Sequence, residues 1–256
     1  MIMVRAYCVG VTVPRMSDVL VPGTYPGRVV VLARTPVGEL LGGVALTGRS
    51  RRSRERVLVP DDGALVVAPA FPGPGSGRAA GSSLTARDPL RHYTAAVSDD
   101  TWTVFGNGDH VETVAKRLAT GTDPRLALDG LEYEPDPPIF TPRITAVVER
   151  ATGHAWLGAA RHAEGLRSGT DVTVTTLGDL GPCEGVVLTT YEPDVSDAEP
   201  FPVASRRHRD VVTRAGGAIT LLDELWSALR GPHRVAASTF VPRDGVLGPV
   251  RLGDAD

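Results

Sequence analysis

A segment rich in arginine is one part of the chain whose residue types could do chemistry. Five arginines occur between Arg49 and Arg56. Guanidinium groups bind phosphate through paired hydrogen bonds, so the segment could hold a phosphorylated ligand. The alternative is a solvated charged turn. Nucleic-acid binding is disfavoured, because neither a basic excess nor interleaved aromatic side chains surround the cluster.

A glycine-rich turn is the second candidate. Residues 106–110, Gly-Asn-Gly-Asp-His, separate an expected strand from a helix expected to start near Val111. Gly and Asn tolerate left-handed backbone angles, so the amides of Asn107 and Gly108 could curl around an anion at the helix N-terminus. A plain turn followed by a helix cap is the alternative. The chain has neither a G-x-G-x-x-G nor a P-loop pattern, so no site of those types is predicted.

Three closely spaced carboxylates form the third candidate. Glu132, Glu134 and Asp136 precede the segment from Thr141 to Ile144. Neighbouring carboxylates repel one another unless they share a cation, and a raised pKa on one of them would suit acid–base catalysis. An acidic surface loop is the alternative. A metal site has no supporting histidine nearby, and none is predicted.

Composition excludes several classes of protein. The 256 residues are 42% hydrophobic and 22% charged, with a formal net charge of -3. This balance is that of a globular protein and implies neither a nucleic acid nor an anionic membrane as partner. Cys8 and Cys183 lie in no disulfide or zinc spacing. No signal peptide and no apolar run of ~20 residues is evident, so we expect a cytoplasmic protein.

Hydrophobic periodicity predicts strands in runs and a few helices, which is typical of an α+β layered domain. Strands are expected at 28–34, 39–46, 57–59, 65–68, 93–97, 102–105, 144–148, 155–158, 172–176 and 185–190.

One helix should run from Val111 to about Gly121, capped by Asp109 or its neighbours, with Val114, Ala115 and Leu118 on its apolar face. A second should start at Asp123-Pro124 with Leu126, Ala127 and Leu131 on one face. A third should cover 218–229, with a stripe formed by Leu221, Leu222, Leu225, Trp226 and Leu229. Residues 1–22 are expected to form an appended strand or arm, and 70–86 a disordered or poorly packed loop.

The order of the candidate segments resembles that of a known family. Seven blocks carry the resemblance: Tyr25-Pro26-Gly27-Arg28, Gly48-Arg49-Ser50 with Arg54, Asp88-Pro89 with Tyr93, Asn107-Gly108-Asp109-His110, Glu132-Tyr133-Glu134 with Asp136, Thr141-Pro142-Arg143-Ile144, and Leu188-Thr189-Thr190-Tyr191. Together they resemble the archaeal-type IMP cyclohydrolases, from about residue 24 to about 242. We therefore predict an IMP cyclohydrolase-like domain at 23–245, an N-terminal extension at 1–22 and a C-terminal tail at 246–256.

The resemblance implies a fold and a reaction. The fold would be a four-layered α/β/β/α sandwich similar to the N-terminal nucleophile hydrolases. The reaction would be closure of 5-formamidoimidazole-4-carboxamide ribonucleotide, or of a related modified nucleotide, to a purine nucleotide with loss of water. No cofactor or metal is implied. The expected partner is a small purine nucleotide, with no nucleic acid or membrane; self-association into a homo-oligomer stays open.

Residue roles follow from the resemblance. It implies that Glu134 is the acid–base group, Tyr93 a hydrogen-bond donor or proton relay, and Arg54 a charge stabiliser. Substrate binding is assigned to Arg28, Arg49, Ser50, Asn107, Gly108, His110, Thr141 and Arg143. Arg28, Arg49, Arg54 and the amides of Asn107 and Gly108 should face one cleft, and Glu134 and Tyr93 should lie in the same cleft. Whether burial or nearby arginines dominate the pKa of Glu134 does not follow from the sequence.

Several departures from the family pattern leave alternatives open. Val44-Ala45 stands where the family tends to have Tyr-Arg, Thr94-Ala95 where it has Asn-Cys, and Arg51-Arg52-Ser53 where it has Phe-Pro-Asn. A diverged, catalytically silent nucleotide-binding protein is one alternative. An amide hydrolase of the same fold is another, and it would need cleavage before Thr24.

Overall fold

The computed structural model describes residues 13–21, 24–70, 92–163, 168–192, 203–229, 231 and 233–253. All statements about structure refer to these residues. The predicted loop at 70–86 lies outside them except for its first residue, as do residues 1–12 of the predicted arm.

The first sheet has six strands in the order β11-β10-β1-β2-β12-β13, and all its pairings are antiparallel. Its members are β1 (Arg28–Arg34), β2 (Leu40–Thr47), β10 (Glu184–Thr189), β11 (Arg209–Val212), β12 (Arg234–Phe240) and β13 (Val250–Leu252). The central strand β1 is buried on both faces: Val30 and Leu32 face one core, whereas Val29 and Val31 face another. Burial on both faces explains why this strand reads as an unbroken apolar run.

The second sheet has seven antiparallel strands that follow the chain in order, from β3 to β9. They are β3 (Arg56–Asp61), β4 (Ala64–Pro69), β5 (Tyr93–Ser98), β6 (Trp102–Gly106), β7 (Arg143–Glu149), β8 (Ala155–His162) and β9 (Thr170–Thr176). Each strand therefore pairs with its neighbour in the chain, and the long connection at 107–142 carries two helices.

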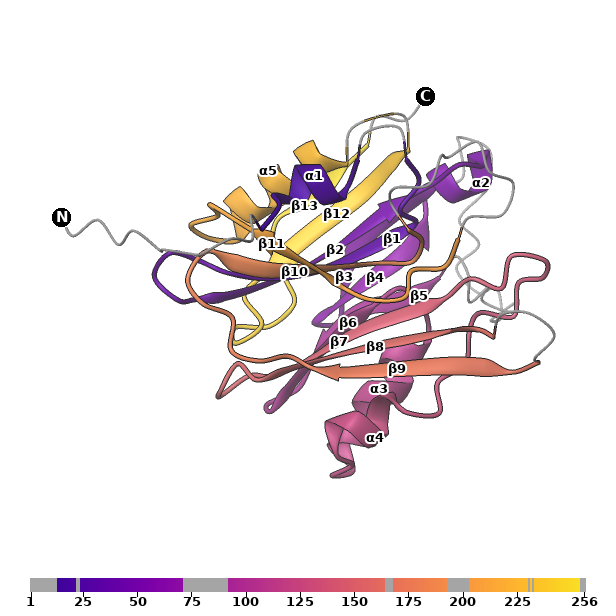
Figure 1. Ribbon diagram of the computed structural model, residues 1–256, viewed down its shortest axis with the longest axis horizontal. Helices are drawn as coiled ribbons and strands as arrows, with labels where there is room; N and C mark the ends of the chain where they lie inside the picture. The colour runs from indigo at the N-terminus through magenta and orange to yellow at the C-terminus, as the bar shows by residue number, and fades with distance from the viewer. Residues whose placement is uncertain are drawn as a thin grey trace.

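Helices cover the outer faces of both sheets (Figure 1). Helices α1 (Met16–Val19) and α5 (Ala218–Ala228) pack on the first sheet, and α3 (His110–Ala119) and α4 (Pro124–Leu128) pack on the second. The central core lies between the sheets, where the rings of Phe105 and Phe240 meet edge to face with centroids 5.1 Å apart. The one-turn helix α2 (Arg51–Arg54) follows β2 and leads into the second sheet. The predicted α+β class with two stacked sheets is confirmed, with strands predominating.

Three local predictions hold only in part. Asp109 precedes α3, but its side chain makes no capping hydrogen bond, because its carboxylate accepts one from Arg143 at 2.6 Å. Leu126 is 64% exposed, and α4 instead buries Ala127 and Leu128 against the second sheet. Within the predicted N-terminal arm, Met16–Val19 is a helix.

The described residues near both ends of the chain belong to the first sheet's layer. Met16, Val19 and Leu20 are buried with the apolar face of α5. Strand β13 pairs with β12 inside the segment expected to be a tail. The domain boundaries stay a prediction, but these residues contribute to the packed structure.

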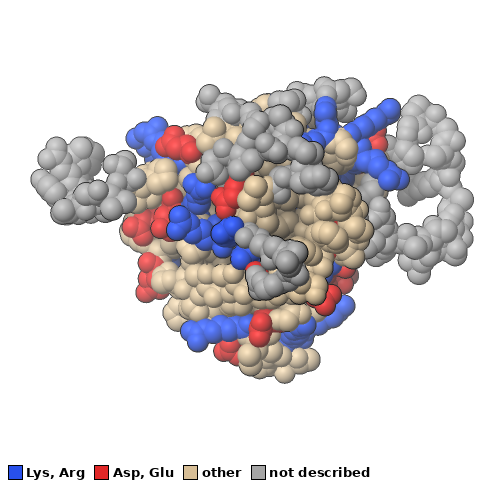
Figure 2. All heavy atoms as spheres, turned by 45° about the vertical axis from the view of Figure 1, so that its right-hand side comes forward, with Lys and Arg blue, Asp and Glu red and all other residues tan. Residues whose placement is uncertain are grey.

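Charged side chains of both signs are interspersed over the face shown in Figure 2. No described helix is long and apolar enough to cross a membrane.

Candidate functional site

The predicted site residues come from elements that begin or end at one edge of the sandwich. Arg28, Tyr93 and Arg143 are the first residues of β1, β5 and β7. The turn at 107–109 follows β6, and Glu134 lies on the loop that precedes β7. Antiparallel pairing places the starts of β5 and β7 beside the end of β6, so the second sheet brings Tyr93, Arg143 and the turn to one edge. Arg28 comes from the first sheet, and its guanidinium lies beside Glu134 at this edge.

A cleft of about 350 Å³ opens at this edge. Its walls are formed by Tyr25, Arg28, Arg49, Ser50, Arg52, Ser53, Arg56, Asp136, Ile139, Thr141 and Tyr191. Four of these residues are arginines, and Asp136 is the one carboxylate among them. The cleft therefore favours an anionic ligand.

Glu134 is buried, with 3% of its side chain exposed, and its carboxylate lies 3.8 Å from the guanidinium of Arg28. The surrounding loop holds it rigidly: the Glu134 backbone N–H donates to Thr141 at 2.8 Å. The Asp136 carboxylate accepts from the Thr141 amide at 2.7 Å and from its hydroxyl at 2.5 Å. Glu134 and Tyr93 do not line the cleft, although both were expected in it; Glu134 lies behind the wall, next to Arg28.

Burial raises the pKa of Glu134 to about 7, with a further contribution from Asp136, although the Arg28, Arg143 and Arg56 guanidinium groups oppose the shift. Burial would lower the pKa of Arg28, but the Glu134 carboxylate and the nearby tyrosines raise it above its ordinary value. Glu134 can therefore exchange a proton near neutral pH while Arg28 stays charged.

Unsatisfied polar atoms concentrate around Glu134. Within the described residues, seven buried side-chain atoms have no hydrogen-bond partner, and five of them belong to Arg28, Tyr93, His110, Glu134 and Arg143. Arg28 adjoins Glu134, and electrostatic interactions join Tyr93 to Arg28 and Arg143 to both Glu134 and His110. Nearly all buried polar groups in proteins are hydrogen-bonded, so such a group points to a ligand that supplies the missing partners.

His110 and Gly108 lie close to Glu134 among these buried polar groups. A Cβ atom on Gly108 would lie 3.1 Å from Nδ1 of His110 and 3.2 Å from Oε1 of Glu134, so the two side chains flank this glycine. Burial, with a contribution from Arg143, lowers the pKa of His110 to about 3. The ring is therefore neutral, with Nε2 2.8 Å from the hydroxyl of Thr145.

Asn107 differs from the prediction. Its backbone N–H donates to Ile144 at 3.2 Å, and its side chain accepts from the Ile144 amide and donates to Pro142. These bonds tie the turn to β7, so the Asn107 amide is not offered to an anion. The predicted amide nest that includes Asn107 is wrong, because the Asn107 N–H that an anion would need already donates to the carbonyl of Ile144 in β7.

The arginines of the 49–56 segment do not all lie at the cleft. Arg49 lies over the ring of Tyr25, 4.7 Å from its centroid, and Tyr25 stacks on Tyr191 at 5.6 Å. Arg54 does not line the cleft; it is exposed, and it donates to the Arg49 carbonyl at 3.2 Å. The structure therefore brings Arg28 and Arg49 together in the cleft and leaves Arg54 outside its wall.

The remaining predicted binding residues have structural contacts of their own. Ser50 lines the cleft and caps α2, where its hydroxyl accepts from the Ser53 amide. The hydroxyl of Thr141 also lies 3.3 Å from that of Tyr191. Arg143 donates to Asp109 at 2.6 Å and to the Glu132 carbonyl at 3.3 Å, beside the cleft rather than in its wall.

A family model described as IMP cyclohydrolase-like protein matches residues 25–245. The chain belongs to this family. The resemblance inferred from the sequence is thereby confirmed. A comparison with curated proteins finds no match.

The departures from the IMP cyclohydrolase pattern lie in different places. Val44 packs between the two sheets and Ala45 beneath α5, so both are core residues. Thr94 donates to Glu112 on α3 at 2.7 Å, away from the cleft. Arg52 and Ser53, by contrast, line the cleft. Of these departures, the arginine segment is the one that changes the wall facing a ligand.

Sequence reasoning missed several residues of this IMP cyclohydrolase-like site. Arg56 is 4% exposed and donates to the carbonyls of Ser53 and Thr47, and burial, followed by the charge of Arg28, lowers its pKa. Its place at the start of a strand whose alternate residue Leu58 is apolar could have marked it as inward-facing. Tyr25 and Tyr191 lie in blocks that carried the resemblance, but nothing in their spacing shows that they stack.

No group of three or more His, Cys, Asp or Glu side chains that could hold a metal ion occurs within the described part of the chain.

Proposed function

We propose that this protein closes the purine ring of 5-formamidoimidazole-4-carboxamide ribonucleotide, or of a related modified nucleotide, with loss of water. The observation that carries the proposal is the buried, hydrogen-bond-deficient group of Glu134, Arg28 and Tyr93 beside an arginine-lined cleft, in a chain of the IMP cyclohydrolase-like family. The proposal places the enzyme in the cytoplasm, with a small purine nucleotide as partner and no cofactor.

The reaction requires proton transfers at two stages. The carboxamide nitrogen attacks the formyl carbon and loses one proton, while the formyl oxygen gains one. The hydroxyl then leaves as water as the formamido nitrogen loses its hydrogen, which forms the ring double bond. Glu134 takes the proton from the attacking nitrogen and returns one to the departing oxygen, a role that a pKa of about 7 suits at neutral pH.

Charge develops on the formyl oxygen during the attack. Tyr93 has a buried hydroxyl without a protein partner, and it donates to this oxygen in the proposed complex. Arg28 stabilises the developing negative charge and the ionised form of Glu134. This role falls to Arg28 and not to Arg54, because Arg28 is the guanidinium beside the acid.

The cleft binds the rest of the nucleotide. Arg49 and Arg52 grip the phosphate, and Tyr25 and Tyr191 offer aromatic surface to the base. Arg56 fixes the shape of the wall through its bonds to two carbonyls. Because Arg52 stands where the resemblance leads us to expect a neutral residue, this wall fits a substrate at least as anionic as a nucleoside monophosphate.

The order of layers supports a fold like that of the N-terminal nucleophile hydrolases, but amide hydrolysis has less support. The hydroxyl of Thr24 donates to the Val21 carbonyl at 2.7 Å, and Met16, Val19 and Leu20 upstream of it are packed in the core with α5. A terminal nucleophile would require this packed segment to be cut away.

The test is direct conversion of the formamido nucleotide, followed by ultraviolet absorbance and by the mass of the product. The expected result is IMP formation, lost in Glu134→Gln. Arg49→Ala should raise KM before it lowers the rate at saturation. Tight binding of IMP without turnover would contradict the proposal and favour a silent nucleotide-binding protein.

A further inference from the structure

A second hollow with arginine side chains lies at the opposite edge of the sandwich. Strand β1 starts with Arg28 at the candidate site and ends with Arg34, and β7 likewise leads from Arg143 toward Arg150. A hollow of about 330 Å³ lies where the turns after these two strands meet the segment after β12, and Arg34, Arg150 and Arg243 line it. In Figure 1 the β1–β2 turn and α2 lie at opposite ends of the molecule.

Arg34 is half-buried and incompletely satisfied. Its Nη1 donates to the Gly38 carbonyl at 3.0 Å, but its buried Nε has no hydrogen-bond partner and no ion pair of Arg34 is found among the described residues. A partly buried cation without a counter-ion is unfavourable, so an anion brought to this position would be stabilised.

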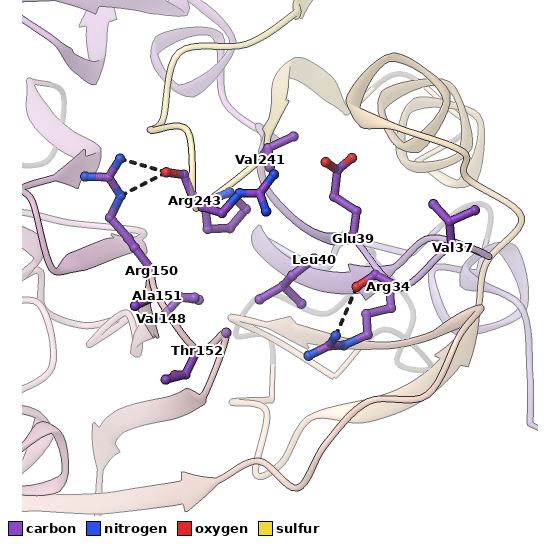
Figure 3. Close-up of a pocket in the computed structure, with 13 residues that line it drawn as sticks. Arg34, Val37, Glu39, Leu40, Val148, Arg150, Ala151, Thr152, Val241 and Arg243 are labelled. Atoms are coloured by element: carbon purple, nitrogen blue, oxygen red, sulfur yellow. Dashed lines mark hydrogen bonds between the residues drawn. The ribbon is translucent and has the colours of Figure 1, made fainter.

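Arg243 supplies a second cation from a different wall. Its Nε lies 3.7 Å from Asp244, but both side chains are largely exposed, so this pair contributes little. Figure 3 shows the side chains of Arg243 and Arg34 directed toward the hollow, whereas Arg150 turns to the carbonyl of residue 243. Arg150 donates to that carbonyl through Nε at 3.2 Å and Nη2 at 2.7 Å, which fixes the backbone that carries Arg243.

The balance of the lining sets the class of ligand. The residues that line the hollow include three arginines and one carboxylate, that of Glu39, so the formal charge of the lining is about +2. Leu40, Val148 and Val241 add apolar surface, and the volume lies at the lower end of the range for small-molecule sites. Arg34 and Arg243 present guanidinium donors from different walls, and the oxygens of a phosphate dianion accept hydrogen bonds from several directions.

We propose that this second hollow binds the phosphate group of a small phosphate monoester through Arg34 and Arg243, with the apolar part of the molecule against Leu40 and Val241. The inference does not rest on the proposed ring closure, because none of these residues lines the cleft beside Glu134.

Phenyl phosphate is a suitable probe, with phenol as its neutral analogue. Titration of methyl-labelled protein is followed by NMR, and the two sites have separate reporters: Leu40 and Val241 for the second hollow, and Ile139 for the cleft. Saturable shifts at Leu40 and Val241 with phenyl phosphate, and none with phenol, are expected. Shifts confined to Ile139 would overturn the proposal and leave the proposed function untouched.

Variants make the test specific. Arg243→Gln changes an exposed side chain, so it should fold normally and weaken the dissociation constant measured at Leu40 and Val241 by about 10-fold or more. Arg34→Lys keeps the charge but loses the fork of donors, and it should also weaken binding. Arg251→Gln is the matched control, since Arg251 pairs with Asp223 and lines neither hollow. Equal affinity in Arg243→Gln and wild type would refute the site.

Discussion

At the scale of single residues, Glu134 is the group on which the proposed chemistry depends. Glu134→Gln keeps the shape of the side chain but removes its proton exchange, so turnover of the formamido nucleotide should fall ~10²-fold or more. Affinity for IMP should change little, because in the proposed complex Arg49 and Arg52 bind the phosphate. Steady-state kinetics and calorimetric titration measure the two effects. Glu132→Gln, an exposed neighbour, is the control and should keep the wild-type rate.

The raised pKa of Glu134 also predicts a pH dependence of stability. The folded protein holds the proton of Glu134 more tightly than the unfolded chain, so the stability from this group is present below its ordinary pKa of 4.5 and is lost as pH rises through about 7. Glu134→Gln has no such loss. Its free energy of unfolding relative to wild type should therefore rise by about 2–3 kcal/mol between pH 5 and pH 8. Urea denaturation at both pH values tests this, and a constant difference would contradict it.

Tyr93 and Tyr191 differ in what their hydroxyl groups do for stability. The Tyr93 hydroxyl is buried without a partner, whereas that of Tyr191 lies 3.3 Å from the Thr141 hydroxyl. Tyr93→Phe should leave the free energy of unfolding equal to that of wild type or higher, and yet reduce turnover. Tyr191→Phe should lose roughly 0.5–1.5 kcal/mol. Thermal unfolding and kinetics of both variants decide the matter: a marked loss of stability in Tyr93→Phe would show that its hydroxyl is structural.

At the scale of elements, α5 illustrates how one helix separates a buried from an exposed face. Leu225 is fully buried against the first sheet, whereas Ile219 on the same helix is 68% exposed. Leu225→Ala should lower the free energy of unfolding by about 2–5 kcal/mol, because it removes packed methyl groups and leaves a cavity. Ile219→Ala should change it by less than about 0.5 kcal/mol. Chemical denaturation of the two variants gives the comparison, and similar losses would contradict this packing.

At the scale of the whole molecule, two outer cores flank the central one, and the two sheets share that centre. Leu225 of α5 and Leu118 of α3 belong to different outer cores, and these two cores have no residue in common. Because both layers rest on the same central core, we expect one cooperative unfolding transition. Losses from Leu225→Ala and Leu118→Ala should add within about 0.5 kcal/mol in the double variant.

Scanning calorimetry of the single and double variants measures this. Two separate transitions would show that the sheets unfold as independent units.

Most of the fold could be predicted from the sequence where an element buries a continuous or periodic apolar face. The bounds of β1 were predicted as Arg28–Arg34, because a β-branched run buried on both faces is a local signal. Strands β11, β12 and β13 were not predicted, nor were α1 and α2. These elements are short or depend on partners far away in the chain, such as β2 for β12 and β10 for β11.

The candidate site divides in the same way. The residue types, an acid, a tyrosine and arginines in a family order, could be taken from the sequence alone. Tertiary structure decided which arginine stands beside Glu134, because the pairing of strands buries Arg28 and Arg56 and leaves Arg54 outside. It also decided the direction of the Glu134 pKa and the use of the Asn107 amide by β7. Burial and proximity are properties of the assembled chain, since they arise from contacts between residues far apart in sequence.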